Sequence, residues 1–210
     1  NSDSDWSLLI GVSKVFWGVA ESRHLVDVIN QVDAVEDIDE EDKLGQPMMR
    51  LSLVKDWGEL SFFVLPGFRS RTFPGTGGRL RSPIAVDDDT ARYESSAGDN
   101  HVDFAARYSH NIGTIDIGLS IFRGTSREPR FALAASGTSL TPIYDQMLQF
   151  GTDIQYTSGA WLWKLEAIYR NAFNDDFAAA VVGFEHTFFQ LGRSVADLGA
   201  VSYTHLTLPT

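Results

Sequence analysis

Hydrophobic and polar residues alternate along most of this chain with a period of two. The clearest case is the segment from Thr114 to Ile121, where Ile115, Ile117 and Leu119 alternate with aspartate, glycine and serine. Successive side chains of a β-strand point to opposite faces of a sheet. The segment therefore predicts a strand with one apolar and one polar face.

The same alternation predicts about eight strands and the beginning of another. The expected strands cover residues 8–19, 48–55, 60–65, 101–109, 114–121, 148–156, 161–170 and 177–189. The last one begins near Gly199. In the first strand, Leu9, Val15, Trp17 and Val19 are expected to share one face, with Lys14 on the other.

Short and long connections alternate between these strands, with one exception, a short turn at residues 174–176. Tight turns are expected at residues 56–59, 110–113, 157–159 and 192–194, and long connections at residues 20–45, 68–98 and 124–143. Long irregular connections are unusual in a compact soluble domain. Outer-membrane barrels, in contrast, have short periplasmic turns and long external loops. The pattern favours an all-β fold, an antiparallel up-and-down meander that forms part of a larger transmembrane β-barrel.

Composition narrows the classes of function. The 210 residues carry a formal net charge of −11, which argues against a nucleic-acid partner, because phosphate neutralisation needs clustered lysine and arginine. The chain has no cysteine, so disulfides, thiolate metal sites and cysteine nucleophiles are excluded. Aromatic residues make up 12% of the chain, which suits a barrel with interfacial aromatic girdles.

Both ends of the sequence predict a fragment. At the N-terminus, Asn1–Asp5 lacks the features of a signal peptide, which an exported barrel would need. No run of the sequence approaches the roughly 18 apolar residues of a membrane-spanning helix. The final residues, 201–210, resemble a translated sequencing adaptor, so we expect a non-native tail there. The alternative is a genuine short strand from Val201 to Leu208. Residues 1–200 are then expected to be a barrel fragment truncated at both ends.

Charged residues recur on the polar faces of the predicted strands. They are Lys14, Arg50, Asp103, Arg107, Asp116, Asp153, Lys164, Glu166, Arg170 and Glu185. A bare Arg or Lys facing lipid costs about 2–4 kcal/mol at the bilayer midplane, so we expect all of them to face the lumen. They would either line a water-filled path with electrostatic selectivity or only form solvated cross-strand ion pairs.

Basic residues gather in the long connections. They are Arg69, Arg71, Arg79, Arg81, Arg92, Arg127 and Arg130, with Arg123 near the third connection. In external loops they could attract anionic solutes or bind lipopolysaccharide phosphates. The simpler interpretation, which we favour, is a set of solvated loops balanced by the acidic first connection.

Other motifs do not indicate catalysis. The acidic run from Asp33 to Asp42 lacks the spacing of a calcium loop, and the segment Pro74–Gly78 lacks the ending of a phosphate-binding loop. The histidines show no metal-ligand spacing, and no nucleophile is indicated. We therefore expect no enzymatic activity, no catalytic residue, no metal and no cofactor.

Four short motifs stand out: Trp17-Gly18, the segment Asp27–Asp33, Gln46-Pro47-Met48 and Ala196–Gly199. With these motifs the chain resembles a family of porin-like proteobacterial outer-membrane barrels of unknown function. Two departures from the family pattern are Asp27 in place of asparagine and Gln31 in place of proline. Trp17, Gly18, Asn30 and Asp33 can be carried over, and the resemblance implies structural roles for them.

Together these features predict a porin-like passive channel or uptake pore for small solutes in the bacterial outer membrane. The expected partners are outer-membrane lipid and lipopolysaccharide, with the solute and the oligomeric state undetermined. Two alternatives stay open at this point: a non-transporting structural or adhesion barrel, and a soluble ligand-binding β-barrel.

Overall fold

The computed structural model describes residues 5–36, 41–79, 81–173, 175–190, 192 and 195–209. Its main element is a nine-stranded antiparallel sheet in which each strand pairs with the next strand of the sheet along the chain. The strands are β1 (Trp6–Ser13), β2 (Gln46–Lys55), β3 (Gly58–Pro66), β6 (Val102–Ile112), β7 (Ile115–Thr125), β10 (Gln146–Ser158), β11 (Trp161–Ala172), β12 (Asp175–Phe188) and β13 (Leu198–Pro209).

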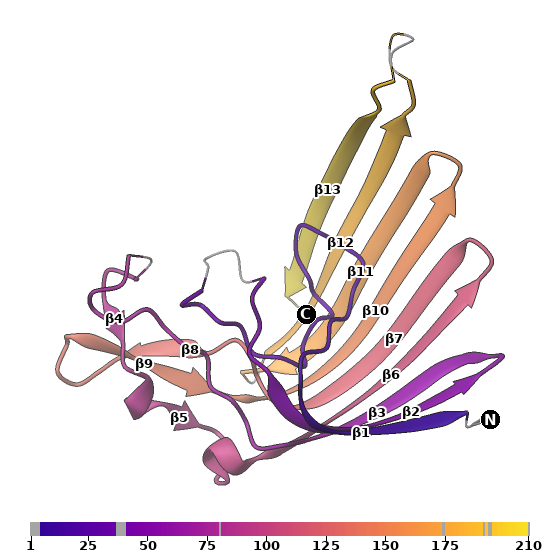
Figure 1. Cartoon of the computed structure of the whole chain (residues 1–210). Coiled ribbons are helices and arrows are strands. Elements are labelled where there is room, and N and C mark those ends of the chain that lie inside the picture. Colours follow the sequence, from indigo (N-terminus) through magenta and orange to yellow (C-terminus); the bar gives the residue numbers. More distant parts are fainter. Residues whose placement is uncertain are drawn as a thin grey trace.

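This arrangement confirms the predicted all-β, up-and-down meander. The sheet is not closed, which is consistent with part of a barrel. Figure 1 shows the strands side by side in a curved sheet, and residues 14–36 and 41–45 lie on its concave side. Strand β13 pairs with β12 from Leu198 to Pro209. This pairing does not report on the origin of residues 201–210, so the non-native tail stays a prediction.

The two faces of the main sheet differ in chemistry. One face, which we call the open face, carries exposed apolar side chains such as Ile10 (69% exposed), Phe104 (54%) and Leu119 (49%). The opposite face, which we call the covered face, carries buried polar and charged residues such as Asp153 and Glu166. Each face collects alternate residues of every strand, as the period of two predicts.

The first strand is shorter than its sequence pattern suggests. Its pairing with β2 ends at Ser13 opposite Gln46, although the apolar alternation continues to Val19. Leu9 lies opposite Arg50 on the covered face and packs against the core, as Val15 does. The chain leaves the sheet after Ser13 because Val15 and Trp17 pack over the covered face instead of continuing along β2.

The short turns after β2, β6 and β10 lie at one end of the main sheet, and the short connection between β11 and β12 lies at the other. The turn between β2 and β3 uses Gly58 with a φ of +125°, and the turn between β6 and β7 uses Gly113 with a φ of +66°. Side chains are disfavoured at such φ values, which explains the glycines. The connections from β1 to β2, β3 to β6 and β7 to β10 are long and lie at the opposite end.

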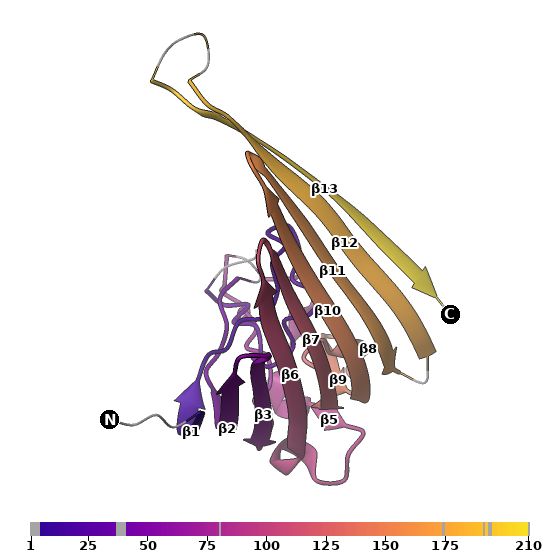
Figure 2. The same cartoon turned by 90° about the vertical axis from the view of Figure 1, so that its right-hand side faces the viewer.

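Two connections that the sequence predicted to be irregular build a second, small sheet. Its strands are β4 (Ala85–Val86), β5 (Arg92–Tyr93), β8 (Arg130–Leu133) and β9 (Ser139–Tyr144), and β9 pairs with the other three. Figures 1 and 2 place it at the end of the main sheet where the long connections lie. Tyr144 is fully buried there, stacked on Tyr93 and edge-on to Phe68, and burial raises the pKa of Tyr144 to about 12.

The hydrophobic core lies between the covered face and the first long connection. Residues 14–36 and 41–45, which we call the covering segment, contribute side chains including Trp17, Val26 and Ile29. The sheet contributes Met48, Phe63, Leu65, Phe122 and Ile168. The main sheet therefore buries its mixed polar face and leaves its apolar face exposed, which is the reverse of a soluble domain.

Candidate functional site

The register of the main sheet gathers the predicted charged residues on the covered face. Opposed residues of neighbouring antiparallel strands share a face. The covered face carries Arg50, Asp103, Arg107, Asp116, Asp153, Lys164, Glu166, Arg170 and Glu185. Lys14 is the exception: it lies beyond the end of β1 and is exposed, so its expected place on this face is wrong.

Glu166 of β11 holds the covering segment to the sheet. Its side chain has no exposed surface, and its Oε1 accepts hydrogen bonds from the backbone N–H groups of Val19 and Ala20, both at 2.8 Å. Its Oε2 accepts a third, from Val26 N–H at 3.2 Å. A Cβ atom on Gly18 would collide with the same carboxylate, so the close approach requires glycine there.

Arg107 and Asp153 form a bidentate ion pair beside this attachment. Arg107 Nη1 and Nη2 donate to the two carboxylate oxygens of Asp153 at 2.7 and 2.9 Å. The guanidinium also lies 5.5 Å from the ring centroid of Trp17 in the covering segment. Charge-assisted bidentate pairs are strong and directional. The pair with Asp153 therefore holds the Arg107 guanidinium in place for a cation–π contact with the Trp17 ring.

Arg127 links the third long connection to the covering segment. Its Nη1 donates to Asp103 Oδ2 at 2.7 Å, and its Nε donates to the backbone oxygen of Ile29 at 3.1 Å. The guanidinium lies 5.2 Å from the ring centroid of Phe68 and 5.0 Å from that of Phe122. Arg127 is only 5% exposed, so the expectation that it is a solvated loop residue is wrong. Its ion pair with the buried carboxylate of Asp103 accounts for the burial.

Two further clusters pair charges of β11 with charges of connecting segments. Lys164 forms ion pairs with Glu21 of the covering segment and with Glu185 of β12. Arg170 donates to Gln149 Oε1 at 2.7 Å and to Glu128 Oε2 at 3.2 Å. The sequence placed Lys164, Arg170 and Glu185 correctly on one face, but Glu21, Glu128 and Gln149 were missed as partners. The hint for Gln149 was its place opposite Arg170 on neighbouring strands.

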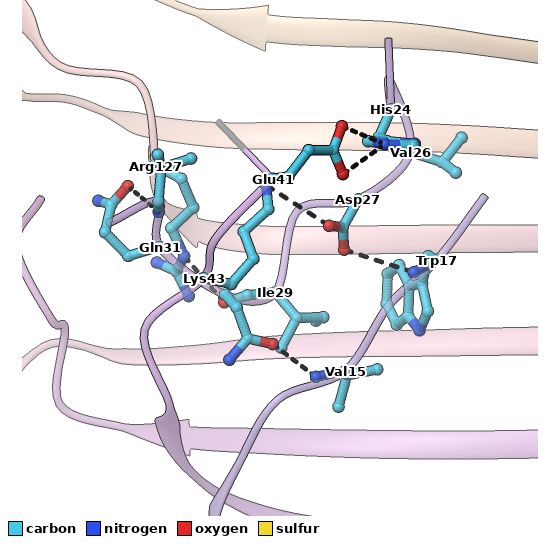
Figure 3. Close-up of polar contacts among 12 residues, drawn as sticks. Val15, Trp17, His24, Val26, Asp27, Ile29, Gln31, Glu41, Lys43 and Arg127 are labelled. Atoms are coloured by element: carbon cyan, nitrogen blue, oxygen red, sulfur yellow. Dashed lines mark hydrogen bonds and ion pairs between the residues drawn. The ribbon is translucent and has the colours of Figure 1, made fainter. Parts of the chain in front are cut away.

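The covering segment is also tied to itself. Asn30 accepts a hydrogen bond from Val15 N–H and donates to the backbone oxygens of Ser13 and Leu44, all within 2.9 Å. Asp27 accepts from Trp17 N–H and pairs with Lys43 at 3.5 Å (Figure 3).

Burial raises the pKa of Asp27, and Lys43 opposes that shift. Asp33 accepts a hydrogen bond from Thr72 Oγ1 at 2.7 Å, which lowers the pKa of its carboxyl group. Trp17, Gly18, Asn30 and Asp33, the four residues that carry the family resemblance, therefore all have structural contacts.

The other basic residues of the long connections lie at the surface or pair there. Arg79, Arg81 and Arg92 are exposed. Arg69 donates to the backbone oxygen of Gly45, and Arg130 forms a bidentate pair with Asp145. Arg71 is half-buried and donates to the backbone oxygen of Arg127. The first long connection, expected to be an acidic external loop, forms the covering segment instead. Residues 37–40 of its acidic run lie outside the described residues.

Cavities remain beside the covering segment. One, of about 280 Å³, is lined by residues such as Arg23, Lys43 and Glu128, and another, of about 420 Å³, lies between the segment and strands β11 to β13. Fixed ion pairs and small polar cavities can bind and guide solutes. Among the described residues, no group of three His, Asp or Glu side chains could hold a metal ion.

Comparisons with known proteins add no relative. A scan against protein-family models and searches of curated proteins and of solved structures found no match. Within the described part of the chain, no helix is long and apolar enough to cross a membrane.

Replacing Glu166 with glutamine should loosen the covering segment. The amide offers one acceptor oxygen and turns an NH₂ group toward backbone donors, and a hydrogen bond to a charged group contributes about 1.5–3 kcal/mol. We expect hydrogen exchange at Val19, Ala20 and Val26 to accelerate about tenfold or more. The matched control is Glu185→Gln on the same face, which should leave these amides protected. Equal exchange in both variants would contradict the assigned role.

Replacing Gly118 with alanine should disrupt the ion pair between Arg107 and Asp153. The added Cβ would collide with both side chains, and overpacking of this kind costs about 1–3 kcal/mol. Denaturant unfolding followed by tryptophan fluorescence should show that loss. Gly75→Ala is the control, because a Cβ atom there meets open space. A Gly118→Ala protein as stable as this control would argue against a rigid pair.

Proposed function

We propose that this chain belongs to an outer-membrane β-barrel and that the covered face lines a passive path for small solutes. The observation that carries the proposal is the inverted distribution of polarity, with the apolar face of the sheet exposed and the charged face inside. No covalent chemistry is involved, because solutes cross along the side chains that the covered face presents.

The open face fits a lipid environment. Its exposed apolar side chains extend over every strand, and they include Leu8, Phe62, Leu119, Phe150, Trp163 and Val182. Soluble monomers rarely expose a continuous apolar patch of more than a few hundred Å². Strands β6 and β7 have 11 residues each, and a tilted membrane strand needs about 9–11.

Aromatic residues gather toward the short-turn end of the open face. Trp57 stacks on Tyr108, and Trp161 stacks on Trp163 with ring centroids 5.6 Å apart. Tyrosine and tryptophan are enriched at membrane–water interfaces, where an apolar ring and a polar group are both accommodated. The cluster therefore supports an aromatic girdle at this end, which the proposal assigns to the periplasmic side.

The covering segment would narrow the path rather than leave it wide. It occupies the concave side of the sheet, and the cavities beside it are small and polar. Charged walls of this kind select solutes by size and charge. Because Arg107, Lys164 and Arg170 are paired with carboxylates or an amide, the wall presents mixed charge rather than one sign.

A second candidate function is a non-transporting barrel. It is favoured by the way the covering segment fills the concave side, since Glu166, Lys164 and Arg170 are all nearly fully buried. In that case the long connections and the small sheet would carry out structural or adhesive work. Conductance distinguishes the two candidates, and detergent dependence distinguishes both from a soluble ligand-binding barrel.

A charge placed at mid-height on the open face should impair membrane insertion. Leu119→Arg should cost about 2–4 kcal/mol if this position faces the bilayer centre. Ile112→Arg, at the short-turn end of the same face, should cost about 0–1 kcal/mol. Reversible folding into lipid vesicles measures both. Equal costs at the two depths would contradict a membrane-facing role for the open face.

The channel proposal is tested in planar bilayers with the full chain. We expect discrete current steps whose reversal potential in a salt gradient shifts toward cations when Lys164 is replaced by glutamate. The Leu119→Arg variant serves as the control with impaired insertion and should give fewer steps. Verified insertion without conductance or solute uptake would remove the channel proposal and leave the non-transporting barrel.

A further inference from the structure

A cavity of about 650 Å³ lies where the open face of the main sheet meets the long connections. Four of its lining residues, Phe104, Arg123, Leu148 and Asn171, lie directly opposite one another in a row across β6, β7, β10 and β11. Glu94, at the end of β5, lines the same cavity. It is therefore bounded by the apolar face on one side and by polar connections on the other.

Arg123 is the cation of this row. It is exposed, and within the described part of the chain it has no ion pair or hydrogen bond. The next open-face residues of β7 toward the short-turn end are Ile121, Leu119, Ile117 and Ile115. Arg123 thus stands where the apolar row of β7 ends, which is where lipid headgroups would begin.

The other polar side chains of the cavity already have partners. Glu94 Oε2 accepts a hydrogen bond from Gln146 N–H at 2.7 Å, and His101 Nδ1 lies 2.8 Å from Asp103 Oδ1. Asn171 donates to Asp176. Among the described residues, the guanidinium of Arg123 thus differs from these side chains in having no partner, and the ligand that matches it is an anion.

The apolar lining selects which kind of anion. Phe104 is 54% exposed, and Leu148 and Phe173 line the same cavity. A small hydrated anion would gain nothing from these side chains, whereas an amphiphile would cover them and so remove apolar surface from water. Guanidinium groups bind phosphate oxygens through two parallel hydrogen bonds.

We infer that this cavity is a binding site for the phosphate group of a membrane lipid, with Arg123 as the phosphate ligand. The acyl chains would lie along the open face over Phe104, Ile121 and Leu148. The inference rests on the proposed function in one respect, that the open face contacts a bilayer.

The test measures lipid binding by native mass spectrometry of the full chain in a neutral detergent. The probes are dioleoyl phosphatidic acid, dioleoylglycerol, which lacks the phosphate, and inorganic phosphate. We expect phosphatidic acid to bind saturably to the wild-type protein and the other two probes not to bind. Arg123→Gln should weaken this binding about tenfold or more, and Arg123→Lys should weaken it less because one charge is kept.

The control variant is Arg92→Gln, which removes an exposed arginine at the same end of the molecule but outside the cavity lining. Unchanged tryptophan fluorescence shows that each variant is folded. Equal losses in Arg123→Gln and Arg92→Gln would overturn the site in favour of general charge attraction. Saturable binding of inorganic phosphate would overturn the lipid in favour of a small anion.

The inference and the proposed function fail differently. A wild-type protein that stays monodisperse without detergent would refute the bilayer-facing role of the open face, whatever Arg123 does. A detergent-dependent protein in which Arg123→Gln binds phosphatidic acid as tightly as the wild type would refute only the lipid site.

Discussion

The buried carboxylate of Glu166 imposes the constraint on which the rest of the structure depends. A carboxylate that leaves water must be compensated by hydrogen bonds or opposite charge. Three backbone N–H groups of the covering segment supply that compensation. Once they do, the backbone at Val19, Ala20 and Val26 is held against the sheet beside Glu166. The cover over the charged face is thus a consequence of the charge itself.

The strands were predictable because their signal is local. In β7, four apolar residues alternate with small or polar ones, and the structure places them on opposite faces as expected. The alternation failed at the end of the first strand, where Val15, Trp17 and Val19 continue the pattern outside the sheet. A segment packed against a core alternates for the same reason as a strand does, so the pattern alone cannot separate them.

The small sheet lay beyond sequence reasoning for a different reason. Its parallel pairs join only two residues at a time, Ala85 with Ser139 and Arg92 with Ile143 at the start of each pair. Such pairs carry no periodic signal and connect residues about fifty positions apart. The same holds for Arg127: its burial depends on Asp103 and on the backbone of Ile29, which no local pattern links to it. Alternation placed the charged residues from Arg50 to Glu185 on one face, but it failed for Lys14 beyond the end of β1, and it could not assign partners outside the strands.

The open edges of the main sheet limit how the proposed barrel can be completed. Among the described strands, β1 pairs only with β2 and β13 only with β12. In lipid, every backbone N–H and C=O group must be satisfied within the protein, so both edges have to be paired. Direct pairing of the two edges would give nine strands, and a barrel of about eight strands has an interior that side chains alone can fill. The covering segment already occupies the concave side with a packed core. In a closed nine-stranded wall, a solute path would therefore have to run through the cavities that remain beside the covering segment.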